Sequence, residues 1–273
     1  MNHAGPPSQN PTVVAVIPAR YSSSRLPGKP LSDIAGRPMV VRVAERALAA
    51  RSVSRAVVAT DDERIFAAVS EAGHEALMTR ADHASGSDRL AEAAARLGAE
   101  IVVNVQGDEP LIHPETIDRA VRALLDDPGS VVSTAFEPIS SAADVLSADV
   151  VKVVADGRGR ALYFSRSPVP YPRDEVRRHG SLAAALEVEP DLLAAFRKHA
   201  GLYVYRRAFL LEFAGWPQSP LERAESLEQL RVLERGHAIR LVEAAGPSIG
   251  VDTAEDLARV RSIFESEAGL ARP

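Results

Sequence analysis

The 273-residue chain is predicted to be an α/β protein: a mostly parallel sheet flanked by helices, with an appended lobe built on a β-hairpin. In the first half, short apolar runs of strand length alternate with longer amphipathic segments, a pattern typical of parallel strands joined by crossover helices. After about residue 130 this alternation stops. There, Gly157-Arg158-Gly159 separates two short apolar runs, which indicates a hairpin.

The elements of the first half follow one another in a regular order. The apolar run that begins at Val13 predicts a buried strand. A helix is expected from Pro38 to about Ala50, because proline often occupies the first helical position and the apolar residues that follow share one stripe. Further strands are expected over 55–60, 75–79 and 100–105. They alternate with a helix capped by Asp61-Asp62, a helix over 87–97 and a helix from Pro114 onward.

The second half predicts a different arrangement. Strands are expected over 131–136, 150–156, 160–164, 201–206 and 239–243. A long amphipathic helix is expected near 221–235, and a C-terminal helix follows Thr253. Residues 173–198 are interpreted as a polar loop followed by a helical stretch.

Composition narrows the possible functions. The formal net charge of −5 argues against a protein that coats nucleic acid, which would carry a basic stripe. The chain has no cysteine, so disulfides, thiolate metal sites and cysteine nucleophiles are excluded, and this is compatible with a reducing, cytoplasmic location. Residues 1–10 do not resemble a secretory signal, and no run approaches the roughly 20 apolar residues of a membrane span, so no membrane association is expected.

A cationic loop follows the first strand. It contains Arg20, Arg25 and Lys29 together with three serines. Ligands of open α/β sheets bind beyond the carboxyl ends of the strands, so cations placed there suit a polyanion such as a nucleoside triphosphate. The loop lacks the G-x-x-x-x-G-K-[ST] phosphate cradle, because Lys29 is followed by Pro30. A solvated basic loop is the alternative.

Two aspartates follow strands and could bind a metal ion. Asp108 comes directly after the strand at 100–105, and Asp252 follows the last strand. One or two carboxylates together with substrate phosphates suit Mg²⁺. Alternatively, Asp108 is an ordinary turn residue, and Asp252 or Thr253 is the N-cap of the last helix.

Further polar clusters lie after other strands. Arg80 and Ser85 flank a predicted helix start, where free backbone N–H groups favour anions, although Ser85 could equally be a plain cap. Arg166 ends a strand and could pair bidentately with a carboxylate. In the alternating segment 199–205, His199, Tyr203 and Tyr205 share one face. Glu225, Glu228 and Gln229 are expected to lie near one another on the helix of 221–235.

Together these segments resemble the 3-deoxy-D-manno-octulosonate (Kdo) cytidylyltransferases. The matching segments occur in order between Val13 and Phe264: IPARYSSSRLPGKPL, ATDD, MTRADHASGSDRLAE, VVNVQGDEPLI, VVKVV, ALYFSR, HAGLYVYR, SPLERAESLEQLRVL and GVDTAEDLARV. The first loop and Q-G-D-E-P are shared among sugar nucleotidyltransferases, whereas YFSR, H-x-G-x-Y-x-Y-R and LEQLR are closer to the Kdo branch. Ala200 departs from the branched aliphatic residue of many relatives, and 181–198 matches poorly.

The resemblance implies a Rossmann-like nucleotidyltransferase sheet in one domain over 12–268, preceded by a tail of residues 1–11. Residues 12–135 and 238–268 would form the nucleotide-binding part, and 136–237 the lobe for sugar binding and dimerisation. The implied activity transfers CMP from CTP to Kdo, giving CMP-Kdo and pyrophosphate for lipopolysaccharide biosynthesis. A homodimer is expected.

The resemblance also implies roles for single residues. Arg20, Lys29, Asp108 and Asp252 would be catalytic, with Asp108 and Asp252 holding Mg²⁺. CTP would be bound by Ala19, Arg20, Arg25, Lys29, Arg80, Ser85, Gln106 and Asp108. The sugar acid would be bound by Arg166, His199, Tyr203, Glu228 and Gln229. The alternatives are a cytidylyltransferase for 8-amino-Kdo or a nonulosonate, a metal-dependent glycosyltransferase, and a non-enzymatic nucleotide sensor.

Overall fold

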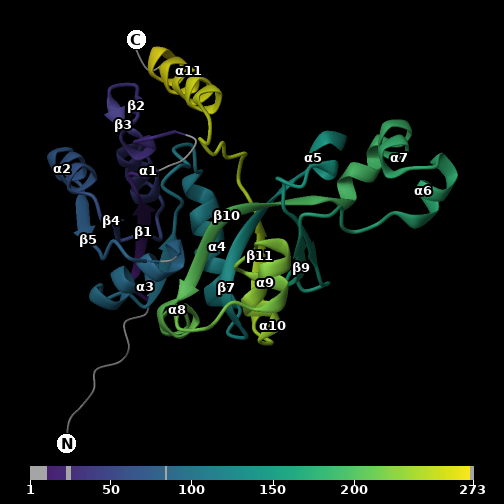
Figure 1. The fold of residues 1–273 in the computed structure, drawn as a ribbon, viewed down its shortest axis with the longest axis horizontal. Coiled ribbons are helices and arrows are strands. Elements are labelled where there is room, and N and C mark those ends of the chain that lie inside the picture. The colour runs from purple at the N-terminus through teal and green to yellow at the C-terminus, as the bar shows by residue number, and fades with distance from the viewer. Residues whose placement is uncertain (1–10, 23–25, 84, 271–273) are drawn as a thin grey trace, which may run out of the picture.

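The computed structural model describes residues 11–22, 26–83 and 85–270. Its central sheet has the strand order β11-β7-β10-β6-β1-β4-β5 (Figure 1). These strands are β1 (Val13–Ala19), β4 (Arg55–Thr60), β5 (Glu75–Met78), β6 (Ile101–Asn104), β7 (Ser130–Pro138), β10 (Arg197–Arg206) and β11 (Ala238–Glu243). Only β10 is antiparallel to its neighbours along this path, so the predicted mostly parallel α/β sheet is confirmed.

Helices cover both faces of the sheet. Because side chains alternate along β1, Val13, Ala15 and Ile17 face one layer, whereas Val14 and Val16 face the other. The first layer contains α1 (Met39–Leu48), α2 (Glu63–Glu71) and α4 (Pro114–Asp126). The second contains α3 (Gly86–Arg96), α8 (Arg207–Ala214) and α10 (Leu230–Glu234). Burial of these two apolar layers is the main stabilising contribution to the fold.

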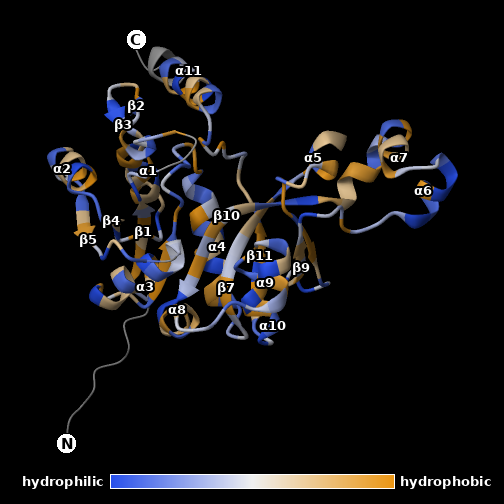
Figure 2. Cartoon of the chain, in the orientation of Figure 1, coloured by the Kyte–Doolittle hydropathy of each residue, from blue (hydrophilic) through white to orange (hydrophobic). Residues whose placement is uncertain are grey.

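The predicted hairpin is present as β8 (Lys152–Ala155) and β9 (Ala161–Ser165), and β8 pairs with β10. Beyond it, an arm projects from the body of the protein (Figure 1). The arm contains α5 (Ala142–Leu146), α6 (Arg173–His179), α7 (Leu182–Val188) and the 3-10 helix η2 (Pro190–Ala195), with a small core of Ile139, Val145, Leu186 and Phe196. Figure 2 shows mainly hydrophilic residues along α6. Strand β10 joins this arm to the middle of the sheet.

The prediction of one long helix near 221–235 is wrong. The structure has two short helices, α9 (Pro220–Glu225) and α10, separated by Ser226 in the left-handed conformation with φ of 52°. Across the break, Arg231 Nε donates to Glu222 Oε2 at 2.7 Å, and both side chains are buried. Nine residues of continuous helix would span about 13 Å, so the break allows this buried ion pair to form.

The last helix, α11 (Ala254–Leu270), packs against the two-stranded sheet of β2 (Asp33–Ile34) and β3 (Arg37–Pro38). Ile34, Met39, Val251 and Val260 form a separate apolar cluster there. This contact brings the segment that precedes α11 to the edge of the sheet where β1 and β6 end. In the part of the chain that the structure describes, no helix is both long and apolar enough to cross a membrane.

Candidate active site

A cavity of about 400 Å³ lies at the carboxyl ends of β1 and β6. Its walls come from three segments far apart in the sequence: the loop after β1, the loop after β6 and the segment before α11. It is lined by Pro18, Ala19, Arg20, Ser22, Lys29, Pro30, Gln106, Gly107, Asp108 and Asp252. The predicted Ala19, Arg20, Lys29, Gln106, Asp108 and Asp252 therefore share one cavity, whereas Arg25 lies outside the described residues.

Lys29 lies between the two predicted aspartates. Its Nζ is 2.6 Å from Asp108 Oδ2 and 3.2 Å from Asp252 Oδ1. The left-handed conformation of Gly28, at φ of +70°, turns the chain into the 3-10 helix η1 (Lys29–Leu31), which Lys29 begins. Burial lowers the pKa of the Lys29 ammonium, but its hydrogen bonds and charge interactions with Asp108 and Asp252 outweigh burial, so its pKa is raised.

Two backbone contacts hold the acidic loops in place. A Cβ at Gly107 would lie 2.8 Å from the Pro18 carbonyl oxygen, so the approach of the β6 loop to the β1 loop requires glycine. The Val251 N–H donates to the Asp108 carbonyl oxygen at 2.8 Å, joining the segment before α11 to the same place. The pattern Q-G-D-E-P does not indicate this role of Gly107, because the role depends on how near Pro18 lies in the fold.

The open choice between Asp252 and Thr253 as the cap of the last helix is resolved. Thr253 Oγ1 accepts from the Asp256 N–H at 3.1 Å, and Asp256 Oδ2 accepts from the Thr253 N–H at 2.9 Å. This reciprocal pair is a capping box. Because Thr253 caps α11, the Asp252 carboxylate is directed to Lys29.

The donor set at Lys29 fits a hard divalent cation. Asp108 and Asp252 already converge on one cationic atom, the Lys29 Nζ. Among the described residues, no group of three or more His, Cys, Asp or Glu side chains could hold a metal ion. Two carboxylates are the usual protein contribution to a Mg²⁺ site that is completed by substrate phosphates and water.

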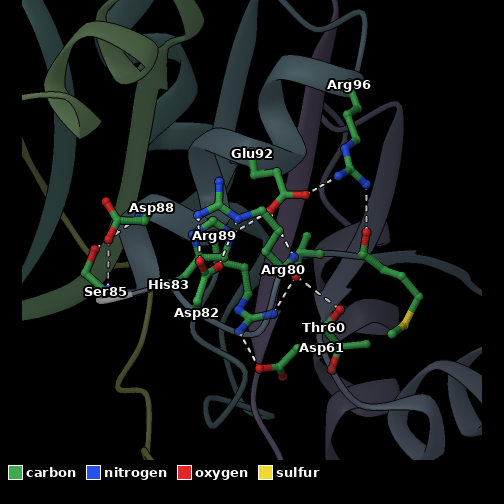
Figure 3. Close-up of polar contacts among 12 residues, drawn as sticks. Thr60, Asp61, Arg80, Asp82, His83, Ser85, Asp88, Arg89, Glu92 and Arg96 are labelled. Carbon is green, nitrogen blue, oxygen red and sulfur yellow. Dashed lines mark hydrogen bonds and ion pairs between the residues drawn. The ribbon is translucent and has the colours of Figure 1, made fainter.

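Arg20 joins the β1 loop to the start of α3. Its guanidinium donates to the carbonyl oxygens of His83 and Ser85 at 2.9 and 3.0 Å. Ser85 forms a capping box with Asp88, so its hydroxyl is engaged by the helix (Figure 3). The guanidinium of Arg80 is exposed and forms a two-point ion pair with Asp82. Neither the hydroxyl of Ser85 nor Arg80 is among the residues that line the Lys29 cavity.

Glu109, which was not singled out from the sequence, lies next to Asp108. Its Oε2 accepts from the Ser248 hydroxyl at 3.0 Å. Burial, followed by the charges of Asp108 and Glu137, raises its pKa to about 7. Nearby, Gln106 Nε2 donates to the Gly201 carbonyl oxygen at 3.3 Å, so the cavity wall is joined to β10.

The three aromatic residues predicted to share a face of β10 are in contact. Ring centroids are 5.3 Å apart for His199 and Tyr203, and 5.9 Å for Tyr203 and Tyr205. Thr134 Oγ1 donates its single proton to the Leu202 carbonyl oxygen, so we assign the 2.9 Å contact of His199 Nε2 with Thr134 Oγ1 as an N–H donation. Burial lowers the pKa of His199 to about 4, so the ring is neutral and its Nδ1 is an acceptor.

Glu228 and Gln229 lie in the turn between α9 and α10. Glu228 Oε2 accepts from the Ser87 hydroxyl at 2.5 Å, and its pKa is raised chiefly by burial. Ser85 and Glu228 line a second cavity of about 410 Å³. Arg20, which lines the Lys29 cavity, donates to the carbonyl oxygen of Ser85, which lines this one, so a single hydrogen bond links the walls of the two cavities. Gln229 Nε2 is buried and finds no hydrogen-bond partner among the residues that the structure describes.

The guanidinium of Arg166 is engaged by the backbone. It donates to the carbonyl oxygens of Glu225, Ala148 and Ser226 at 2.7, 2.9 and 3.5 Å. Below it, the fully buried ammonium of Lys152 donates to three further carbonyl oxygens. Arg166 therefore links the hairpin to the carboxyl end of α9. It does not line the Lys29 cavity.

The chain is similar to known proteins along most of its length. The cytidylyltransferase family profile matches residues 14–239. The 3-deoxy-manno-octulosonate cytidylyltransferase of Syntrophotalea carbinolica is 54% identical over 251 residues, covering 92% of this chain and 98% of that protein. Its counterpart from Geobacter sulfurreducens is 53% identical over 252 residues, covering 91% of this chain and 97% of that protein.

Solved structures show the same fold. A CMP:2-keto-3-deoxy-manno-octonic acid synthetase complexed with CTP aligns with a TM-score of 0.84 at 46% identity, covering 94% of this chain and 99% of that chain. A nucleotidyl transferase from Methanothermobacter thermautotroptrophicus aligns with a TM-score of 0.61 at 16% identity, covering 94% and 99%, which supports the fold alone.

Proposed function

We propose that this chain, which belongs to the 3-deoxy-manno-octulosonate cytidylyltransferases, transfers CMP from CTP to Kdo and releases pyrophosphate. One structural observation carries the proposal. Lys29, Asp108 and Asp252, which come from three separate segments, converge at the carboxyl edge of the sheet beside Arg20. This is where an open α/β sheet binds its ligand.

The chemistry is an in-line displacement. The anomeric hydroxyl of Kdo releases its proton to solvent as its oxygen bonds to the α-phosphorus of CTP, and the bond from that phosphorus to the bridging oxygen breaks. Pyrophosphate leaves with the electron pair. The protein forms no covalent intermediate, so positioning and charge neutralisation supply the catalysis. Arg20 and Lys29 are assigned to the triphosphate because both cations line the cavity.

Asp108 and Asp252 are assigned to hold Mg²⁺, since both are hard oxygen donors that meet at one point. When bound, the ion would neutralise phosphate charge and lower the pKa of the sugar hydroxyl. Lys29 would then exchange contacts with the two carboxylates for contacts with phosphate oxygens.

The sugar is assigned to the region between β10 and the α9–α10 turn. A neutral His199 and the hydroxyl of Tyr203 suit uncharged hydroxyl groups, and Glu228 and Gln229 add an acceptor and donors. Burial raises the pKa of Tyr203, so its phenol stays protonated and can donate. Arg166 is the proposed partner of the sugar carboxylate, which requires it to leave part of its backbone contacts.

A homodimer formed through the lobe, a role in lipopolysaccharide biosynthesis and a cytoplasmic location complete the proposal. The projecting arm supports the dimer, because Leu146, Tyr171 and Val188 expose large apolar side chains on it or beside it.

Pyrophosphate release tests the function. The protein is incubated with CTP and Mg²⁺, with no sugar, Kdo, 8-amino-Kdo or a nonulosonate. We expect release that depends on the sugar and a kcat/KM that is highest for Kdo. Preference for another acid would reassign the substrate, and glycosyl transfer without pyrophosphate would indicate a glycosyltransferase. CTP binding without sugar-dependent release would indicate a nucleotide sensor and overturn the proposal.

A further inference from the structure

A further polar cavity, of about 390 Å³, lies away from the two cavities described above. It is formed by the end of α4, the β8–β9 turn and β11. Five arginines line it: Arg119, Arg122, Arg158, Arg160 and Arg240. The lining contains two aspartates, Asp126 and Asp127, which leaves a net excess of three positive charges in a chain whose net charge is −5.

This arginine cavity lies at the opposite edge of the sheet from Lys29. Strands β1, β6, β7 and β11 run in the same direction, because β10 is antiparallel to both β6 and β7 and β11 is parallel to β7. Lys29 follows the carboxyl end of β1, whereas Asp127 precedes the amino end of β7. The two cavities share no lining residue.

Backbone and carboxylate contacts hold three of the guanidinium groups in place, and among them Arg119 donates to the Glu243 carbonyl oxygen at 3.2 Å. Arg160 forms a bidentate pair with Asp127, with N–O distances of 2.9 and 2.6 Å. Asp127 also accepts from Ser130 and from the Gly129 N–H, so it is fixed at three points and its pKa is lowered. Arg240 donates to the Arg158 carbonyl oxygen in the β8–β9 turn.

The remaining positive charge is not compensated by ion pairs. Among the described residues, no carboxylate forms a salt bridge with Arg122, Arg158 or Arg240. Arg119 forms one long contact with Glu115, at 3.5 Å. Gathering like charges in one concave place raises the free energy of the folded protein unless an anion neutralises them.

We infer that this arginine cavity binds a compact phosphate-bearing small molecule at a site separate from the nucleotide cavity. The planar guanidinium fork matches two phosphate oxygens at once, which makes arginine the preferred side chain for such anions. Arg160 and Arg240 are oriented before binding, so less side-chain entropy is lost when the anion arrives. Exposed Arg122 and Arg158 are free to close over it.

Calorimetric titration with inorganic tripolyphosphate tests the inference. The wild-type protein should bind it at two sites, the nucleotide cavity and the arginine cavity. In Arg122→Gln/Arg158→Gln, one of the two affinities should fall at least tenfold, and CTP should displace what still binds. Neither side chain donates a hydrogen bond to another described residue, so the variant should fold normally, which its Tm checks.

The matched control is Arg51→Gln/Arg177→Gln, which removes the same charge from exposed positions elsewhere and should keep both sites. Sugar-dependent pyrophosphate release without tripolyphosphate should be unchanged in both variants, so failure of the proposed function is measured separately. If wild type binds one equivalent that CTP displaces completely, or if Arg122→Gln/Arg158→Gln binds like wild type, the inference is overturned.

Discussion

Lys29 and Asp108 lie 79 residues apart in the sequence, yet the Lys29 Nζ is 2.6 Å from the Asp108 Oδ2. The same ammonium reaches Asp252, so one cation joins the first loop of the fold to the last. With no substrate bound, the single positive charge of Lys29 offsets the repulsion between the two carboxylates.

Replacing Lys29 by Met should therefore affect binding, catalysis and stability. We expect kcat/KM for CTP to fall about 10²-fold or more, because a preorganised cation for the phosphates is lost. Stability should fall by only about 1 kcal/mol, since Asp108 and Asp252 are partly exposed to solvent. Steady-state kinetics and chemical denaturation measure the two effects. Lys198→Met, which removes a lysine outside the cavity, is the control, and equal kinetic losses in both variants would contradict the assignment.

Asp108→Asn and Asp252→Asn test the metal assignment. Each should lower turnover about 10²-fold or more and shift the Mg²⁺ dependence of pyrophosphate release to higher concentration. The Asp156→Asn variant serves as the comparison, because Asp156 lies in the β8–β9 turn, outside the Lys29 cavity. Normal turnover and unchanged Mg²⁺ dependence in both site variants would remove the two aspartates from the metal site.

His199 should make the protein less stable in mild acid. Its pKa is lowered from 6.5 to about 4 in the folded state, so below pH 6.5 the unfolded chain binds a proton that the folded chain does not. When the pH is lowered from 7.5 to 5, this single group should reduce the free energy of unfolding by about 2 kcal/mol. Denaturation of wild type and His199→Gln at both pH values measures it, and a pH dependence that is the same in both would be evidence against a neutral, buried His199.

Ser226→Gly should stabilise the protein. A left-handed conformation costs a non-glycine residue about 1 kcal/mol or more, and Ser226 adopts φ of 52°. We expect Ser226→Gly to raise Tm and Ser226→Val to lower it. A helix continuous from 220 to 234 would give the opposite order, because glycine weakens a helix interior.

Lys152→Met should destabilise the hairpin lobe. The Lys152 ammonium is fully buried and donates to the carbonyl oxygens of Ser147, Val150 and Arg166 at 2.7, 2.6 and 2.5 Å. Removing the ammonium leaves buried acceptors unpaired, so we expect the free energy of unfolding to fall by about 3 kcal/mol. Denaturation measures it, with Lys198→Met as the less buried comparison. A loss no larger than that of Lys198→Met would show that the three contacts contribute little.

The sequence alone determined the alternation of strands and helices, the hairpin and the candidate residues at the carboxyl edge. Apolar periodicity and turn residues are local properties, and the carboxyl ends of parallel strands lie at one edge, so Asp108 could be expected at the same edge as Lys29. That the two strands are neighbours came from the structure. The resemblance supplied the substrate class and the choice of residues on the sugar side.

Only the tertiary structure decided how individual side chains are used. In the folded protein Thr253 caps α11, and the Asp252 carboxylate accepts from Lys29 instead. The guanidinium of Arg166 donates to backbone carbonyl oxygens. The segment 221–235 forms two short helices, and the break between them allows Glu222 to pair with Arg231. Such outcomes depend on competition among partners far apart in the chain, and that competition has no periodic signature in the sequence. The arginine cavity, gathered from three separate segments, arises for the same reason.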